Sequence, residues 1–117
     1  MNGKSAALAD CTYGVKLLTY PVIASFADGT TADIYDGLDT KQARKIPRTI
    51  WSVAQRKLDM VEVAHELNDL RVPPGNKLES LKGQNAGYHS IRINDQYRIV
   101  FKWADGVAKD VSIKDYH

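Results

Sequence analysis

The chain has 117 residues, of which 44% are apolar and 26% charged, the balance of an ordinary soluble domain. Its formal net charge of +2 is too small for a protein that binds nucleic acid mainly through bulk charge. No apolar run approaches the ~20 residues that span a bilayer. The single cysteine, Cys11, excludes an internal disulfide and favours a reducing compartment. We therefore expect one cytoplasmic domain without membrane contact.

The positive charge is concentrated in the C-terminal part of the chain. Residues 1–70 contain eight Lys or Arg and nine Asp or Glu, a net charge of −1. Residues 71–117 contain eight and five, a net charge of +3. Since this part also has the patterns of a sheet, a sheet surface is the best candidate for contact with an anion.

The first residues show no clear period, and we assign residues 1–21 to an N-terminal extension of uncertain order and residues 22–117 to the folded domain. A short strand is expected over 21–26, because the proline at its first position tolerates the missing donor. Asp28 can cap a short helix over 31–35, which Gly37 would end.

Two further helices are expected before the sheet. Pro47 fits the first turn of the main helix, and apolar residues follow at three- and four-residue steps from Ile50 to Val61. A shorter helix is expected over 62–70, with inward side chains at Val63, Ala64 and Leu67. Basic residues cluster around the main helix: Lys41, Arg44, Lys45, Arg48, Arg56 and Lys57. We interpret them as a solvated helix face, and the less favoured alternative is a surface edge that binds an RNA backbone.

Residues 87–103 have the pattern of a β-hairpin. Apolar and polar residues alternate on both sides of Asn94-Asp95, so one face of the hairpin is apolar and must be buried. Residues 73–76, P-P-G-N, predict a rigid turn into an extended segment over 77–82, and Ala104 to Gly106 predict a turn into a last strand. Helices followed by an antiparallel meander define an α+β fold, in which the helices cover the apolar face.

The opposite face collects polar groups that RNA cleavage needs. Cleavage at a 2′-hydroxyl requires a base, cations that hold the charge of the phosphorane, and an acid for the leaving 5′-oxygen. The three His, at 65, 89 and 117, lack the spacing of metal ligands, so no metal is expected. The candidates are the residues with parity opposite the core, the neighbouring Lys82, the last three residues and the tyrosines that could stack on a base: Arg92, Arg98, Lys102, Lys114, Lys82, Asp115, Tyr116, His117, Tyr88 and Tyr97.

Each of these residues also has an ordinary structural role. Basic residues on the outer face of a sheet are usually solvated, and a terminal histidine is usually poorly ordered. Tyr97 and His89 share parity with the core, so we expect Tyr97 to be packed and His89 to be half-buried. From the residues alone, the interpretation reaches an RNA-binding α+β domain with the elements of a nuclease.

The sequence resembles a family in three places. Residues 72–83 read V-P-P-G-N-K-L-E-S-L-K-G, residues 87–103 form the hairpin, and the chain ends in D-Y-H. Together with V-I-A-S-F at 22–26 and A-Q-R-K-L-D-M at 54–60, these runs resemble the HigB-type toxins, the plasmid maintenance system killer branch of the RelE/ParE superfamily. The resemblance implies a small α+β domain in which an N-terminal strand and helices pack on a C-terminal antiparallel sheet.

The resemblance also implies an activity and partners. It implies a toxin that acts as a ribosome-dependent endoribonuclease on mRNA in the A site, without metal or other cofactor. Its partner would be a HigA-type antitoxin with a helix-turn-helix, through which alone the complex would reach operator DNA.

Site residues are implied by position in the family's motifs. Lys82 matches a lysine that stabilises the transition state, Arg98 an arginine near the scissile phosphate, and residues 115–117 the terminal catalytic trio. Where some members have a histidine, this chain has Glu79, which leaves the general base open between Glu79, Asp115 and His117. Substrate contacts would come from Tyr88, Arg92, Lys102 and Lys114.

Two other functions share this fold. A ParE-like relative would act without chemistry by binding DNA gyrase, and a degenerate toxin would serve as a binding module of a DNA-bound complex. Lys82 and the terminal Asp-Tyr-His favour RNA cleavage over both, whereas the fold itself does not decide.

Overall fold

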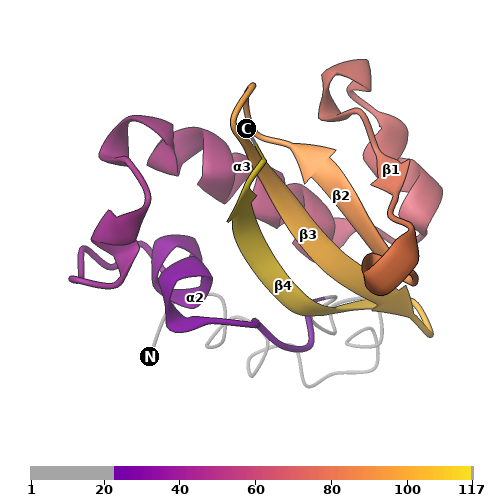
Figure 1. Ribbon diagram of the computed structural model, residues 1–117, viewed down its shortest axis with the longest axis horizontal. Coiled ribbons are helices and arrows are strands. Elements are labelled where there is room, and N and C mark those ends of the chain that lie inside the picture. Colours follow the sequence, from indigo (N-terminus) through magenta and orange to yellow (C-terminus); the bar gives the residue numbers. More distant parts are fainter. Residues whose placement is uncertain (1–22, 117) are drawn as a thin grey trace, which may run out of the picture.

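The computed structural model describes residues 23–116. The predicted extension over 1–21, Cys11 and His117 lie outside this range. The described part contains two α-helices and four strands: α2 (Gly29–Tyr35), α3 (Trp51–Val63), β1 (Glu79–Ser80), β2 (Tyr88–Arg92), β3 (Tyr97–Ala104) and β4 (Val107–Asp115). The strands form one antiparallel sheet in the order β1-β2-β3-β4, and α3 crosses behind it (Figure 1). The predicted α+β architecture is confirmed.

The predicted N-terminal strand is reduced to two isolated bridges. Ile23 pairs in parallel with Ala108, and Phe26 with Val111, both on the outer edge of β4. The backbone N–H groups of Ala24 and Ala27 donate to the carbonyls of Ala108 and Val111. The segment thus lies along the edge of β4, with the pairing interrupted between its two ends.

The short first helix forms for the predicted reason. The side chain of Asp28 accepts a hydrogen bond from the Thr31 N–H at 2.8 Å, which caps α2, and Gly37 follows with a positive φ of 75°. The helix begins at Gly29, two residues earlier than predicted.

The predicted helix over 62–70 is wrong. Helix α3 continues to Val63, the chain is extended at Ala64, and a 3-10 turn spans Leu67–Arg71. The Asp69 carboxylate accepts hydrogen bonds from the N–H groups of His65 and Glu66, which favours this local turn over a continuous helix. Val63 is 68% exposed, contrary to the inward orientation predicted for it, whereas Ala64 is buried and Leu67 half-buried.

The core lies between α2 and α3 on one side and the apolar face of the sheet on the other. Leu58 of α3, Ile34 of α2, and Ile99, Phe101 and Val111 of the sheet are fully buried. Tyr97, Ile99 and Phe101 are buried at alternate positions along β3, as the sequence predicted, but Val100, predicted on the opposite face, is buried too. No helix among the described residues is long and apolar enough to cross a membrane. The opposite face of the sheet is the surface on which the candidate site residues lie, and we call it the open face.

Candidate functional site

A row of basic residues crosses the open face. Arg92 on β2 pairs in register with Arg98 on β3, and Arg98 pairs with Lys114 on β4. Side chains of paired residues leave the same face of a sheet, so the structure brings these predicted residues together. Nearer the other end of the strands, Tyr88 pairs with Lys102, and the Lys102 ammonium lies 5.8 Å from the centre of the Tyr88 ring.

Arg98 is the most firmly held member of this row. Its Nε donates to the Ser90 Oγ at 2.8 Å, and its Nη2 donates to the Lys77 carbonyl at 2.6 Å and to the Ser90 carbonyl at 3.4 Å. The side chain of Arg98 is only 11% exposed, and Ser90 is fully buried. A guanidinium with this many acceptors is fixed in orientation, which is what a group that stabilises a developing charge requires.

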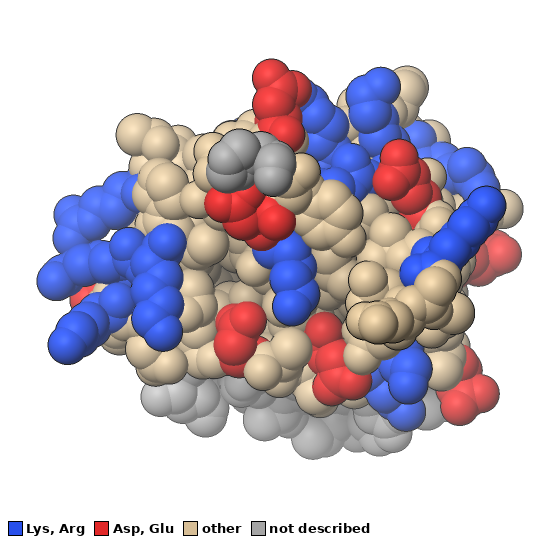
Figure 2. Space-filling model, in the orientation of Figure 1, with Lys and Arg blue, Asp and Glu red and all other residues tan. Residues whose placement is uncertain are grey.

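Carboxylates accompany the cations, so the open face has mixed sign rather than the expected positive sign. Glu79 lies opposite Ser90 in the sheet, and its Oε1 is 3.9 Å from Arg98 Nη2. Arg92 forms an ion pair with Asp95 in the hairpin turn. Figure 2 shows red and blue side chains interspersed over this face. The local pattern of fixed groups therefore matters more here than net charge.

Lys82 lies at the far end of the sheet from Arg98. It is exposed, follows β1 and precedes the 3-10 turn Gly83–Asn85. The preceding Leu81 N–H donates to the Tyr88 carbonyl, which places Lys82 at the beginning of β2, whereas Arg98 faces the end of β2. The two cations therefore lie apart, and only a ligand that extends across the open face would contact both.

The last residues lie at the Arg98 end. Asp115 pairs with Tyr97, so alternation along β4 directs its side chain to the face opposite Lys114. There Gln96 Nε2 donates to Asp115 Oδ2 at 3.0 Å, and the Tyr116 N–H donates to the Gln96 carbonyl. Asp115 thus contacts the hairpin turn, Tyr116 is 44% exposed, and His117 lies outside the described residues.

The aromatic candidates divide as predicted. Tyr97 is 8% exposed and belongs to the core, while Tyr88 remains half-buried on the open face. His89 is half-buried against Phe101, with a ring-centroid distance of 6.1 Å, and burial lowers the pKa of its imidazole. Of the three tyrosines proposed to stack on a base, Tyr88 and Tyr116 are therefore the ones that a ligand on the surface could reach.

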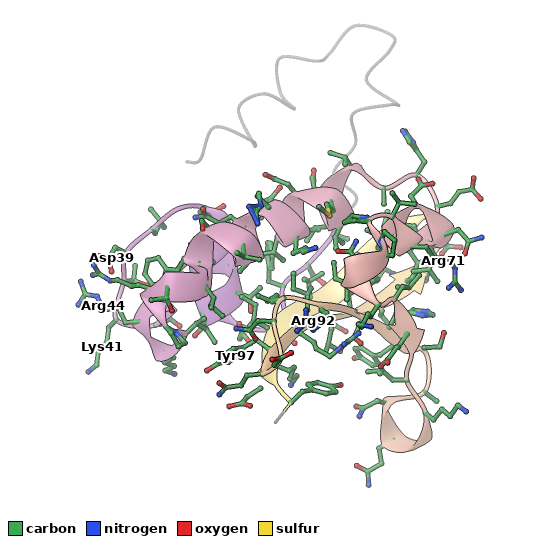
Figure 3. The ribbon with its side chains drawn as sticks, turned by 90° about the horizontal axis from the view of Figure 1, so that it is seen from above. Asp39, Lys41, Arg44, Arg71, Arg92 and Tyr97 are labelled. Atoms are coloured by element: carbon green, nitrogen blue, oxygen red, sulfur yellow. The ribbon has the colours of Figure 1, made fainter. Side chains whose placement is uncertain are left out.

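The basic cluster before α3 is separate from the open-face row. Asp39 lies between Arg44 and Arg48, and the hydrogen bond from Arg44 and the charges of both arginines lower the pKa of its carboxyl. Figure 3 shows Asp39, Lys41 and Arg44 together at one end of the molecule, away from Arg92 and Tyr97. Lys57, predicted with this cluster, instead donates to the buried Asn76, and burial lowers its pKa.

A pocket of about 430 Å³ opens on the face that carries Lys114. Val100 and Ser112 are among its lining residues and are nearly inaccessible to solvent. Its polar lining includes three residues that sequence reasoning did not select: Gln84, Asn85 and Asp110. Ser90, which holds Arg98, was also missed. Ala108 is an apolar residue out of step with Val111 and Ile113, and this break in the alternation was the sequence signal for an extra residue at Asp110.

Among residues 23–116, no three His, Cys, Asp or Glu are grouped as metal ligands would be.

The fold and the sequence agree on the class of protein. The chain has the fold of a chain in the YoeB-YefM complex from Staphylococcus aureus, with a TM-score of 0.53 and 22% identity over 81% of this chain and 97% of that one. Residues 24–117 match the family described as the RelE-like toxin of type II toxin-antitoxin system HigB. The chain therefore belongs to the HigB-like toxin family, as the sequence motifs indicated.

Curated relatives support this membership. The sequence is 45% identical to toxin HigB-1 of Vibrio cholerae over 71% of this chain and 85% of that protein. It is 34% identical to endoribonuclease HigB of Proteus vulgaris over 52% of this chain and 65% of that protein. These matches establish a toxin of a type II system, which implies a partner antitoxin. They do not favour the ParE-like alternative that binds gyrase.

Proposed function

We propose that this toxin is an endoribonuclease that cleaves mRNA in the ribosomal A site. The observation that carries the proposal is the fixed guanidinium of Arg98, in a row with Arg92 and Lys114, on the open face beside the end of β4. Similarity to endoribonuclease HigB of Proteus vulgaris supports the reaction type. A cationic row of this kind suits a phosphodiester whose charge increases in the transition state.

In the proposed reaction, the protein's own side chains supply acid, base and charge stabilisation without a metal. The 2′-oxygen attacks the adjacent phosphorus as a base removes its proton, and the 5′-oxygen leaves as an acid protonates it. Arg98 stabilises the phosphorane, and Lys82, at the far end of the sheet, would hold a more distant phosphate of the same RNA. Histidine side chains have a reference pKa of about 6.5, so His117 is the residue we propose for acid or base work near neutral pH. Glu79 lies beside Arg98 and is a second candidate base, whereas Asp115 is directed toward the hairpin turn.

The partners follow from this activity. The substrate is translated mRNA, which places the protein in the cytoplasm, and the ribosome would supply RNA contacts that a chain of net charge +2 lacks. A HigA-type antitoxin with a helix-turn-helix would silence the toxin and carry the complex to operator DNA.

The test is inducible expression with and without the antitoxin, together with mapping of mRNA 5′ ends. Wild type should arrest growth and produce new 5′ ends in translated frames, and Lys82→Ala and His117→Ala should each abolish both effects while still binding antitoxin. Lys41→Ala removes an exposed lysine at the end of the molecule away from Arg92 and serves as the matched control, which should remain toxic.

Two results would contradict the proposal. Full toxicity of both the Lys82 and the His117 variants would exclude this site as the source of growth arrest. Equal cleavage rates of purified mRNA with and without ribosomes would exclude dependence on the ribosome.

A further inference from the structure

Strand β4 contains a backbone outlier in its middle. Asp110 has a φ of 52°, in the left-handed region that non-glycine residues seldom adopt inside a strand. The register with β3 shifts at this point, since Val100 pairs with Ser112 but Lys102 pairs with Lys109. Asp110 is therefore an extra residue in a β-bulge, a feature that redirects side chains and is common next to active sites.

Contacts from the N-terminal segment hold the bulge in place. The Asp110 N–H donates to Ser25 Oγ at 2.9 Å, and the Val111 N–H donates to the Ser25 carbonyl at 3.1 Å. The Ala27 N–H in turn donates to the Val111 carbonyl at 2.9 Å along the same edge of β4. A strained residue that its surroundings fix in this way suggests a functional use, and aspartate is among the residues that tolerate the conformation best.

The bulge places Asp110 in the lining of the 430 Å³ pocket on the open face. The Tyr88 hydroxyl approaches Asp110 Oδ2 at 3.5 Å, and Lys114, from the same row as Arg98, also lines the pocket. The volume is within the range of about 300–1,000 Å³ typical of small-molecule sites. The pocket thus offers a carboxylate acceptor, an ammonium donor and an aromatic ring on the same face as Arg98.

We propose that this pocket binds one nucleotide of the RNA and selects guanine; the inference depends on the nuclease function proposed above. The Watson–Crick edge of guanine presents one acceptor, O6, beside two donors, N1–H and N2–H₂. The Asp110 carboxylate can accept from both donors, and the Lys114 ammonium can donate to O6. Adenine and cytosine place a ring nitrogen acceptor beside their amino group, and uracil has one donor between two acceptors, so each would leave a carboxylate oxygen without a donor or facing an acceptor.

The experiment is the same mapping of 5′ ends, with the base composition counted around each cut. Wild type should favour guanine at one fixed position relative to the cut. Asp110→Asn should reduce that preference by about tenfold while cleavage continues, because the amide offers only one acceptor. Asp110→Gly removes the carboxylate and the backbone strain together, so it should lose the preference without losing thermal stability.

A control separates the pocket from general effects of charge. Asp105 also has a positive φ, of 55°, in the turn between β3 and β4, and is not among the residues that line the pocket. Asp105→Asn should keep the wild-type preference. Cleavage by wild type without a guanine preference, or with one that Asp110→Asn leaves unchanged, would overturn the inference and leave the nuclease function intact.

Two other outcomes are also decisive. Loss of antitoxin binding in Asp110→Asn with an unchanged cleavage pattern would assign the pocket to the antitoxin and overturn the inference. No cleavage by wild type at all would refute both the proposed function and the inference.

Discussion

The two faces of the sheet are built on different principles. On the core face, Ile91, Ile99, Phe101 and Val111 are fully buried and contact one another and the helices. On the open face, Ser90 and Ser112 are also buried and both pair with Val100, and the next pair on this face, Arg98 with Lys114, is charged. The core face depends on filled volume, whereas the open face depends on the direction of individual hydrogen bonds. Substitutions should therefore separate stability from activity according to the face that they change.

The largest effect should come from the core face. Phe101→Ala removes a fully buried ring that contacts both His89 and Trp103, and we expect a loss of about 3–5 kcal/mol in the free energy of unfolding. This loss is a large fraction of the roughly 5–15 kcal/mol that keeps a small domain folded, so toxicity should fall together with the folded population. Denaturant titration followed by circular dichroism measures it.

The next residue along the strand provides the matched control. Lys102 is exposed on the open face, and Lys102→Ala should change the free energy of unfolding by no more than about 0.5 kcal/mol. Similar losses for both variants would show that the two faces are not separable.

The second prediction concerns the open face. Arg98→Lys keeps the charge but lacks the planar group that contacts Ser90 Oγ and the Lys77 carbonyl at once. We expect ribosome-dependent cleavage to fall by about 10²–10³-fold, the effect of removing one preorganised donor, while the folded structure persists. Rates of mRNA cleavage, with melting temperatures for comparison, provide the measurement.

Arg92→Lys is the corresponding control on the same row. Arg92 pairs with Asp95, whose side chain is 98% exposed, so an ammonium can replace its contacts at little cost. Full cleavage by both variants would indicate that only the charge of the row matters, and an equal loss in both would show that the fixed geometry of Arg98 is not special.

The sequence predicts the hairpin well because its pattern is local. Alternation on both sides of Asn94-Asp95 specifies register and faces, and Asn94 completes the turn by accepting from the N–H groups of Gln96 and Tyr97. The predicted helix over 62–70 failed because apolar spacing does not reveal that the Asp69 side chain competes for backbone donors.

The site was less accessible to sequence reasoning than the fold. Parity predicted that Arg92, Arg98 and Lys114 share a face, which the register confirms. The acceptor that Arg98 finds at the Lys77 carbonyl, however, depends on tertiary contact between distant segments. The bulge at Asp110 likewise depends on Ser25, which precedes it by 85 residues. Interactions of this kind leave no periodic signal in the sequence.

The smallest expected effect is a dependence of stability on pH at the edge of the core face. Burial lowers the pKa of His89 below its ordinary value of 6.5, so the folded protein favours the neutral imidazole. At a pH between the lowered pKa of His89 in the folded protein and its ordinary pKa in the unfolded chain, the unfolded chain binds more protons than the folded one. Stability therefore rises with pH in this range. The stability that the neutral ring contributes should be complete above pH 6.5 and should decline as the pH falls toward the lowered pKa.

His89→Gln tests this sign, because glutamine can keep a hydrogen bond with Ser80, which lies 3.1 Å from His89 Nδ1, and does not titrate. The melting temperature of wild type should fall more between pH 7.5 and pH 5 than that of the variant. His65→Gln, at an exposed position beyond α3, should behave as wild type. Carboxylates contribute equally to the pH dependence of all three proteins. An identical change of melting temperature with pH in wild type and His89→Gln would therefore show that His89 does not link protonation to folding. A smaller slope in His89→Gln alone would indicate that the core face, and not the open face, carries the dependence on pH near neutrality.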